Sequence, residues 1–318
     1  MIQKKIVDLI EQYDTIVIHH HIQPDPDCIG SALGLKYILQ ASYPNKKVYV
    51  VGKHNDRTRF LGDLDEVSDD IYPNSLGIIV DVGDRHRVED QRIFESKALI
   101  KIDHHPFTEE LGVLEWVDTS YAAVTEMILD LVVHNQDRLQ LTEEAARVLY
   151  AGLLTDTGRY YYDNVSERTL HHGALAYAYP FDKQKLYEHI YYKSIEELKF
   201  TGYIQTEFTL TEHGVGYMKI DRETLERFNV HPDEASGMVN TLSNIKEVLL
   251  WIFFVEYDDH IRVEFRSRGP VVNTLARQFN GGGHKFASGA IAESWEEVDA
   301  MVQAANEACK EFTSLSKG

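Results

Sequence analysis

The sequence contains few cysteines, no long apolar run and little positive charge. Its two cysteines, Cys28 and Cys309, lie far apart in the chain, and neither forms a CxxC pair. This spacing argues against a disulfide framework and against a zinc ribbon, so we expect no thiol chemistry. The sequence also shows neither an N-terminal apolar leader nor an apolar run long enough to span a bilayer. We therefore expect a cytoplasmic protein without a membrane partner.

Basic residues are outnumbered by acidic ones. The chain has 32 Lys and Arg against 51 Asp and Glu, which gives a net charge of −19 at pH 7. A protein that grips long nucleic acid normally presents an extended basic surface, so we expect no long nucleic acid as a partner. A small anionic substrate stays compatible with this charge, because bound divalent cations would reverse the local sign inside a pocket.

The first half of the chain alternates short apolar runs with helical patterns. The runs lie at 15–21, 47–52, 76–84 and 98–105, and helices are expected at 29–40, 121–134 and 142–154. Runs that are apolar on both faces and separated by helices are typical of a parallel sheet. The pattern predicts an α/β domain, residues 1–185, in which a parallel sheet carries helices on both faces.

The second half of the chain has a different pattern. A helical stretch continues to about residue 200, and after it we expect a hairpin at 206–220, strands at 248–257 and 260–268, and a helix from about 295. This mixture predicts a smaller α/β domain with a mixed sheet. We place a helical linker at 186–200 and the second domain at 201–318.

Acidic residues and histidines gather where the predicted strands of the first domain end. In an open parallel sheet, ligands bind outside the carboxyl ends of the strands. The residues at these ends, with one more after the helix that begins at Thr142, are Asp25, Asp27, Asp81, Asp103, His104 and Asp156. Asp81 ends a strongly apolar strand, where a carboxylate is costly unless it is paired or binds a metal.

Three consecutive histidines precede this acidic group. Alternation along a strand directs His19 and His21 to one side and His20 to the other. His21 is nearest the edge of the sheet and is the candidate ligand, whereas we expect His20 to lie under a helix or behind the site. A simpler explanation exists for Asp25 and Asp27, which could form a turn and a helix cap.

Two imidazoles and four carboxylates together suit a pair of divalent ions, and manganese is the natural candidate. Two such ions can clamp a phosphoryl group for displacement, so the set predicts phosphoester hydrolysis.

Arginines and glycines mark the second domain. Arg262, Arg266 and Arg268 are separated by even steps, so we expect them on one face of a strand, where guanidinium groups match phosphate geometry. The loop at 280–284 offers backbone amides to an anion, with His284 as a further donor. A solvated edge strand and a flexible loop would look similar. In contrast, His171 and His172 lack acidic partners at ligand spacing, and we assign them to packing or to the surface.

The motifs HHHIQPDPDCIGS, DVGD, DHH and GLLTDTGRY are followed by RSR and GGGHKFASGA. In this order they resemble the DHH phosphoesterases that carry a DHH-associated C-terminal domain. Within that family the chain is most similar to the bacterial oligoribonuclease/pAp phosphatases known as nanoRNases. The resemblance implies hydrolysis of short oligoribonucleotides to mononucleotides and removal of the 3′-phosphate of pAp, with two divalent ions, Mn²⁺ first among them.

The resemblance also implies a role for each motif residue. His21 and Asp25 would hold one metal, Asp27, His104 and Asp156 the other, and Asp81 would bridge them. His105 would face the scissile phosphate, with Asp103 behind it. The implied nucleotide contacts are Arg262, Arg266, Arg268, Gly282, Gly283 and His284. Val82 departs from the family, in which a small hydroxyl residue often takes this place.

Three other functions stay open at this point. A family II inorganic pyrophosphatase shares the N-terminal motifs, but its C-terminal domain resembles a lysine-rich clamp. A cyclic-dinucleotide or linear-dinucleotide phosphodiesterase belongs to the same superfamily. A catalytically inactive nucleotide sensor is the alternative from a different class. The sequence also leaves open the direction of RNA degradation, the arginine that grips the nucleotide, and whether the chain forms a homodimer.

Overall fold

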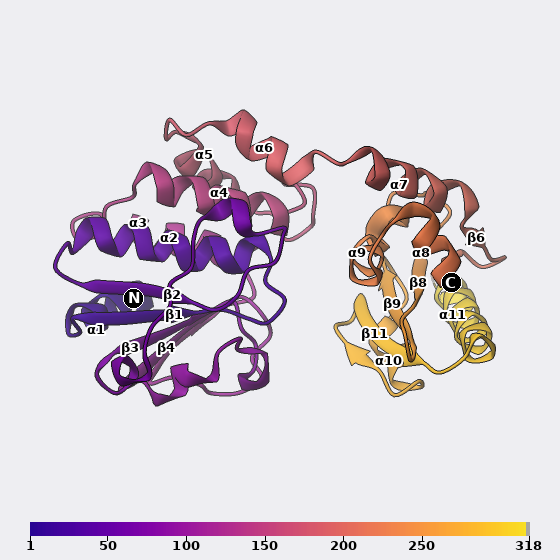
Figure 1. Ribbon diagram of the computed structural model, residues 1–318, viewed down its shortest axis with the longest axis horizontal. Coiled ribbons are helices and arrows are strands. Elements are labelled where there is room, and N and C mark those ends of the chain that lie inside the picture. The colour runs from indigo at the N-terminus through magenta and orange to yellow at the C-terminus, as the bar shows by residue number, and fades with distance from the viewer. Residues whose placement is uncertain (316–318) are drawn as a thin grey trace. The chain divides into compact units, whose positions relative to one another are not determined.

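The computed structural model describes residues 1–315, which form two compact units (Figure 1). The first unit is Met1–Tyr192, and the second begins at Lys193. The predicted linker at 186–200 is divided between them, because α6 (Lys183–Tyr191) belongs to the first unit and α7 (Ile195–Glu207) to the second. The last three residues of the predicted second domain, 316–318, lie outside the described residues. Within the described part, no helix is both long and apolar enough to cross a membrane.

The first unit is built on a five-stranded sheet with the order β2-β1-β3-β4-β5. Its strands are β1 (Thr15–His19), β2 (Lys47–Val51), β3 (Leu76–Val80), β4 (Ala98–Asp103) and β5 (Leu114–Val117). Every neighbouring pair is parallel, which confirms the predicted parallel sheet. The chain order reverses at β1, because β2 lies on one side of it and β3 on the other. This reversal is where ligands bind in open α/β sheets.

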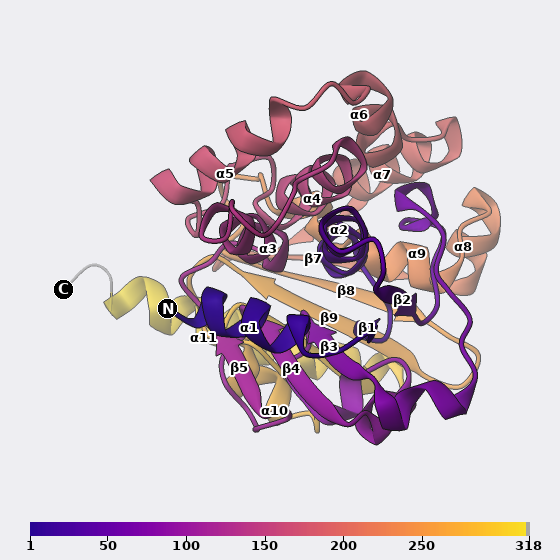
Figure 2. The ribbon, with the colours of Figure 1, turned by 90° about the vertical axis from the view of Figure 1, so that its left-hand side faces the viewer.

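Helices cover both faces of this sheet, as predicted (Figure 2). The α-helices of the unit are α1 (Ile2–Glu11), α2 (Pro26–Ser42), α3 (Val124–Val133), α4 (Glu143–Asp156), α5 (Glu167–Tyr177) and α6. One face packs against α1, α2 and α3 through residues such as Ile16, Ile78 and Ile100. On the other face lie the 3-10 helices η2 (Asp69–Asn74) and η4 (Gln91–Glu95), through Tyr72 and Ile93. The unit also contains η1 (Arg59–Leu61), which packs beside α2, and η3 (Arg85–Arg87).

Local chemistry fixes where α2 begins and how α4 meets it. Asp25 caps α2 by accepting a hydrogen bond from the Cys28 N–H, and Pro26 occupies the first helical position. Gly152 lets α4 approach this end of α2, because a Cβ there would lie 2.8 Å from Cα of Asp27. The close approach brings the end of α4 beside the beginning of α2.

The second unit contains a mixed six-stranded sheet, as predicted, with the order β10-β11-β9-β8-β7-β6. The strands are β6 (Thr209–Leu210), β7 (Val215–Ile220), β8 (Leu250–Glu256), β9 (Ile261–Ser267), β10 (Gly282–Gly283) and β11 (Ala287–Ala292). β7 and β8 are parallel, and the other pairs are antiparallel. The antiparallel β6 and β7 form the predicted hairpin.

Helices pack on both faces of this second sheet. They are α7, α8 (Arg222–Phe228), α9 (Pro232–Gly237), η5 (Val239–Leu242), α10 (Val272–Arg277) and α11 (Trp295–Leu315). On β9, Val263 and Phe265 are buried with α10 and α11, which directs the alternate residues Arg262, Glu264 and Arg266 to the opposite face. The charged side of β9 thus lies on the face that carries α9, with Glu264 buried and the two arginines partly exposed.

Candidate metal centre

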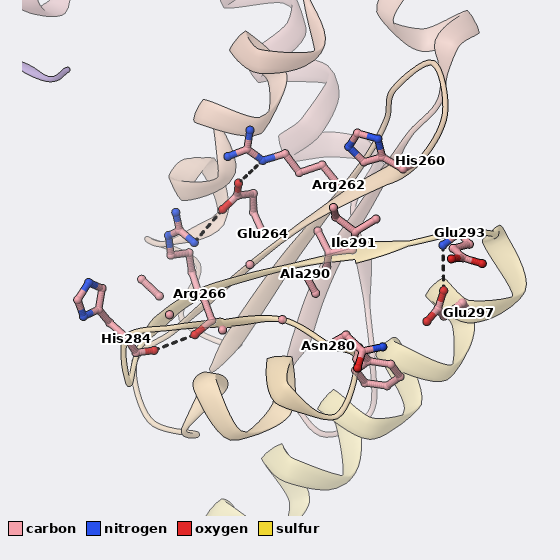
Figure 3. A pocket seen from close by; sticks show the side chains of 18 residues that line it. His260, Arg262, Glu264, Arg266, Asn280, His284, Ala290, Ile291, Glu293 and Glu297 are labelled. Atoms are coloured by element: carbon pink, nitrogen blue, oxygen red, sulfur yellow. Dashed lines mark hydrogen bonds and ion pairs between the residues drawn. The ribbon is translucent and has the colours of Figure 1, made fainter. Parts of the chain in front are cut away.

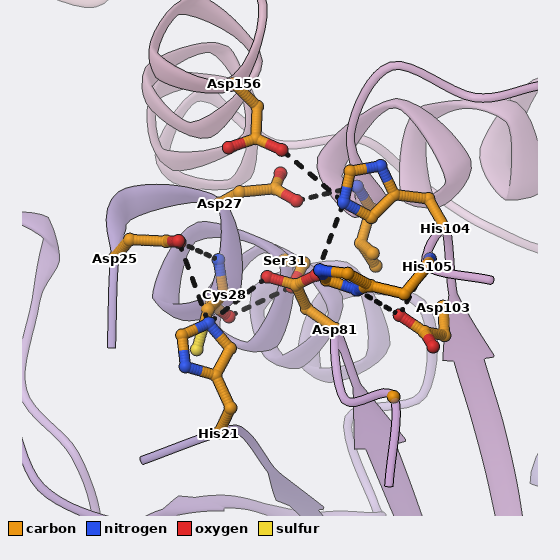
Figure 4. A network of polar contacts seen from close by, with 12 residues as sticks. His21, Asp25, Asp27, Cys28, Ser31, Asp81, Asp103, His104, His105 and Asp156 are labelled. Atoms are coloured by element: carbon orange, nitrogen blue, oxygen red, sulfur yellow. Dashed lines mark hydrogen bonds and ion pairs between the residues drawn. The ribbon is translucent and has the colours of Figure 1, made fainter. Parts of the chain in front are cut away.

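The predicted metal ligands lie together at the carboxyl ends of the parallel strands (Figure 4). His21 and Asp25 follow β1, Asp81 follows β3, and His104 follows β4. Asp27 lies in the first turn of α2, and Asp156 is the last residue of α4. Four separate segments therefore meet at the reversal of strand order. The structure brings the residues together, and their roles as ligands stay predictions.

His21 forms one group with two aspartates. Its Nε2 lies 3.7 Å from Oδ2 of Asp25 and 3.4 Å from Oδ2 of Asp81. Its Nδ1 lies 2.7 Å from the carbonyl oxygen of Ile22, which suits an Nδ1–H donor. This hydrogen bond fixes the tautomer that leaves Nε2 as a metal-ligating atom. Burial acts to lower the pKa of His21, but Asp25 and Asp81 outweigh it, so the pKa lies above its usual value.

His104 forms a second group with the same geometry. Its Nε2 lies 3.5 Å from Oδ1 of Asp81 and 3.5 Å from Oδ2 of Asp156. Its Nδ1 lies 3.3 Å from the carbonyl oxygen of Tyr121. Ligand atoms of Asp27, His104 and Asp156 all lie within 4.8 Å of one another, a spacing that one metal ion can satisfy.

Asp81 lies between the two groups, because one of its oxygens faces His21 and the other faces His104. Its backbone has φ of +59°, in the left-handed region, which aspartate tolerates better than most residues. The side chain is 3% exposed, and Oδ1 has no hydrogen-bond partner among residues 1–315. A buried oxygen without a donor, held by an unusual backbone, fits a carboxylate that binds cations.

The crowding of carboxylates also fits bound cations. Burial, together with the charge of Asp81, raises the pKa of Asp27 to about 7. Partial burial, together with the charge of Asp27, raises the pKa of Asp156 well above its usual range. Positive ions would remove this repulsion and keep the carboxylates ionised. The nitrogen and oxygen donors of this site therefore fit the two divalent ions that the sequence predicts.

His105 and Asp103 form a pair beside the ligands. Nδ1 of His105 lies 2.8 Å from Oδ1 of Asp103 and 3.4 Å from Oδ1 of Asp81. Burial lowers the pKa of His105, but the hydrogen bond to Asp103 and the charge of Asp81 raise it above its ordinary value. Asp103 is itself fully buried, and Nζ of the fully buried Lys101 lies 3.8 Å from its other oxygen.

The other two histidines of the triplet lie outside the site. His19 is fully buried, and its Nε2 lies 3.2 Å from the hydroxyl of Tyr72. His20 is fully buried against Gly52. Burial lowers the pKa of His19 to about 3 and that of His20 to about 4, so both are neutral at pH 7.

Sequence reasoning missed several neighbours of the site. The thiol of Cys28, set aside earlier, lies within 4.8 Å of the ligand atoms of His21 and Asp81. Thr125 donates its hydroxyl to Asp27. Lys101 donates to the carbonyl of Gly83 at 2.8 Å. A lysine inside the apolar run ALIKID was the one signal that could have revealed a buried ion pair.

His172 has the packing role that the sequence predicts, but it also has acidic neighbours. Its side chain is 3% exposed and lies 3.7 Å from Glu126 and 3.5 Å from Asp130. Both acids lie on α3, far from His172 in sequence, so spacing along the chain could not show them.

The second unit contains a hollow of about 1060 Å³ between β9 and the glycine loop (Figure 3). Its lining includes Arg262, Arg266, Gly282, Gly283 and His284 from the predicted substrate-binding set. Glu264, which the sequence analysis did not assign, lies between the arginines. Its Oε1 is 2.8 Å from Nε of Arg262, and its Oε2 is 3.2 Å from Nη1 of Arg266. Glu264 therefore holds both guanidinium groups in one orientation.

Arg268 does not line this hollow with Arg262 and Arg266. β9 ends at Ser267, and the amide of Arg268 donates to the carbonyl oxygen of Leu249, just before β8, at 3.0 Å. The Arg268 guanidinium instead donates to the carbonyl oxygens of Ser243, Ile245 and Val248. Val82, the departure in the second motif, is buried in a small apolar cluster with Ile79 and Val88.

Comparisons with known proteins agree with the division of the chain into two units. Residues 15–153 match the family described as "DHH family, N-terminal domain", and residues 214–311 match the "DHHA1 domain". The "Bifunctional oligoribonuclease and PAP phosphatase NrnA" of Bacillus subtilis is 42% identical over 96% of this chain and 98% of its own length. The protein of the same name from Mycoplasma pneumoniae is 35% identical over 93% of each chain.

Two matches at lower identity were also found. The "Cyclic-di-AMP phosphodiesterase PdeA" of Listeria monocytogenes is 24% identical over 89% of this chain but 46% of its own length. The crystal structure of an exopolyphosphatase-related protein from Bacteroides fragilis has a TM-score of 0.87 and 24% identity, and it covers 100% of this chain and 98% of its own. The chain belongs to the DHH family, with the DHH domain in its first unit and a DHHA1 domain in its second.

Proposed function

We propose that this chain is a metal-dependent phosphoesterase that hydrolyses short oligoribonucleotides to mononucleotides and removes the 3′-phosphate of pAp. The observation that carries the proposal is the arrangement around Asp81, whose two oxygens face His21 and His104 in separate ligand groups. Two relatives that span nearly the whole chain, from Bacillus subtilis and Mycoplasma pneumoniae, bear names that state both activities.

In this proposal His21 and Asp25 hold one ion, and Asp81 contacts both ions. Asp27, His104 and Asp156 hold the other ion. Imidazole and carboxylate donors together favour Mn²⁺ over an all-oxygen magnesium site. When bound, the two ions would neutralise charge on the phosphoryl group and activate water for attack.

His105 acts on the phosphate in this proposal. Asp103 accepts the hydrogen bond from Nδ1–H of His105 and so fixes the orientation of the ring. Held in this way, the protonated imidazole can donate through Nε2 to a phosphoryl oxygen as negative charge develops there. Lys101 stabilises the buried charge of Asp103 from behind.

The hollow of the second unit binds the nucleotide in this proposal. Arg262 and Arg266 supply the charge, and Gly282, Gly283 and His284 supply donors close to the backbone. We leave Arg268 out of the nucleotide contacts, because its guanidinium is already engaged by three carbonyl groups. Glu264 cancels part of the arginine charge, which favours a ligand of one or two phosphates over a long strand.

The acidic composition supports short substrates. Affinity for long RNA depends on many Lys and Arg contacts to phosphates, and this chain has 32 basic residues against 51 acidic ones. We expect kcat/KM to fall as the RNA becomes longer.

One turnover panel tests the proposal. The substrates are pAp, RNA of two to five nucleotides, a longer RNA, a cyclic dinucleotide and pyrophosphate, each assayed with Mn²⁺ and with excess chelator. We expect multiple turnovers of pAp and short RNA with Mn²⁺ and none with chelator. Preferred hydrolysis of pyrophosphate or of the cyclic dinucleotide would contradict the proposed substrates. Binding without turnover beyond one equivalent would indicate a sensor.

A further inference from the structure

One short segment of the first unit holds two of the predicted ligands. The segment 120–125 leads into α3, and its carbonyl at Tyr121 lies 3.3 Å from Nδ1 of His104. Its amides at Val124 and Thr125 donate to the two oxygens of Asp27 at 2.7 and 2.9 Å. Asp27 and His104 belong to the same ligand group, so the position of this segment decides whether the group is assembled.

Glu126 and Arg168 clamp this segment from the side opposite the ligands. Oε2 of Glu126 accepts from the amide of Ala122 at 2.8 Å, and its Oε1 accepts from Nε of Arg168 at 2.9 Å. Arg168, on α5, also donates to the carbonyl of Ser120 at 2.7 Å. Its guanidinium lies 3.5 Å from the centre of the Tyr121 ring. One ion pair therefore reaches three consecutive residues, 120–122.

Burial makes this clamp stiff. Glu126 is fully buried and also accepts a hydrogen bond from the Thr169 hydroxyl at 3.2 Å. The Tyr121 hydroxyl donates to Asp130 at 2.9 Å, which fixes the other end of the ring that Arg168 covers. The Arg168 side chain is 35% exposed, whereas Glu126 is fully buried. Removing Arg168 would take the guanidinium away from a buried carboxylate and leave the imidazole of His172 3.7 Å from it, so the segment would move to relieve the cost.

The ligands of the other ion do not depend on this segment. Nδ1 of His21 is held by the carbonyl of Ile22, and Asp25 is held by the amide of Cys28. A change in the segment 120–125 would thus alter one ligand group and leave the other in place.

We propose that the Glu126–Arg168 ion pair is a positioning device that sets the affinity of the ion held by Asp27, His104 and Asp156. The inference rests on the proposed function in one respect, the presence of two ions. Partners that orient metal ligands from behind typically change metal affinity by about 10- to 100-fold when they are removed.

Metal binding by Arg168→Met tests the inference, with Arg138→Met as the matched control. Arg138 makes an ion pair of the same kind with Glu11 and Asp8, and those acids lie on α1, outside the site. Calorimetric titration of the full chain with Mn²⁺ counts the ions and gives each affinity. Electron paramagnetic resonance shows whether two Mn²⁺ ions are close enough to couple.

We expect the wild type and Arg138→Met to bind two coupled Mn²⁺ ions. Arg168→Met should keep one ion at wild-type affinity, bind the second about 10- to 100-fold more weakly, and lose the coupled signal at limiting Mn²⁺. Arg168→Lys keeps the charge but loses the planar guanidinium group. Its affinity for the second Mn²⁺ should therefore lie between those of the wild type and Arg168→Met. If Arg168→Met does not fold, Glu126→Gln makes the same test, because it removes the charge and keeps the side-chain shape.

Three results would overturn the inference. The first is two ions bound at wild-type affinity by a variant whose only change is a lower melting temperature. The second is an equal loss of both ions. The third is the binding of a single ion by the wild type, which would also contradict the proposed two-metal mechanism. A wild type that binds two ions but hydrolyses none of the panel substrates would refute the proposed function and leave this inference intact.

Discussion

Replacing the three consecutive glycines 281–283 by alanine, one at a time, distinguishes the glycines that the fold requires from one that is available to bind a ligand. A Cβ at Gly282 would meet no atom within 4 Å, and Gly282 does not have a left-handed backbone. Gly281→Ala would instead place a Cβ 2.3 Å from the carbonyl oxygen of Gly289. Gly283 has φ of +136°, and a Cβ there would lie 2.7 Å from the carbonyl oxygen of Ala287. The neighbours therefore serve the fold, and Gly282 is available to a ligand.

The three variants should differ in the free energy of unfolding, and Gly282→Ala should also change KM. Gly282→Ala should leave the free energy of unfolding unchanged or raise it by up to about 1 kcal/mol, because alanine restricts the unfolded chain. Gly281→Ala should lower it by about 1–3 kcal/mol through overpacking, and Gly283→Ala by a similar amount through backbone strain. If the phosphate approaches the amide of Gly282, the added methyl group would occupy the open space beside it, hold the phosphate away and so prevent a hydrogen bond to a charged group. Such a bond is worth about 1.5–3 kcal/mol, so KM for pAp should rise about 10- to 100-fold.

Urea unfolding of each variant, together with KM and kcat for pAp in Mn²⁺, tests this reasoning. A wild-type KM for Gly282→Ala would refute the approach of the phosphate to this amide. An unfolding free energy as low as that of Gly281→Ala would show that the space beside Gly282 is filled.

Four further predictions concern the rest of the site. Asp81→Ala should weaken the binding of both ions and reduce kcat by at least about 100-fold; a normal metal content with a wild-type rate would contradict its bridging role. His105→Ala should lower kcat by about 10²- to 10⁴-fold at unchanged Mn²⁺ content, measured by calorimetry and steady-state turnover, and lost metal would make His105 a ligand. Arg266→Ala should raise KM for pAp, whereas Arg268→Ala should lower the melting temperature with KM unchanged; the reverse result would exchange their roles. Excess chelator should lower the melting temperature and abolish turnover, and added Mn²⁺ should restore both; a melting temperature insensitive to Mn²⁺ would argue against a bound ion.

The strand ends of the first unit could be predicted because their chemistry is local. A carboxylate that closes an apolar run, as Asp81 does, is expensive without a cation, and parallel strands bring their carboxyl ends to one edge. Strand alternation likewise placed Arg262 and Arg266 on one face. Arg268 follows at the next even step, but its guanidinium donates to the carbonyl oxygens of Ser243, Ile245 and Val248 and does not line the hollow. Contacts of a side chain with a distant loop cannot be predicted from the residue pattern of one strand.

The supports behind the ligands could not be predicted. The carbonyl that orients His104 belongs to Tyr121, and every residue offers such a group, so its identity carries no signal. The acids beside His172 lie on another helix, and no spacing along the chain reports contact between helices. β5 escaped prediction for a similar reason, because its four residues, Leu114–Val117, form too short an apolar run.

The wide sequence separation of the ligands has a kinetic consequence. His21 follows the first strand, whereas Asp156 ends α4, so the last ligand arrives only after α4 has docked on α2. A half-folded chain would offer the ions scattered carboxylates and no pocket. If the ions bind only to the assembled site and not to the transition state for folding, they slow unfolding without speeding folding. The metal ions would thus stabilise a domain that must first assemble by its own apolar packing.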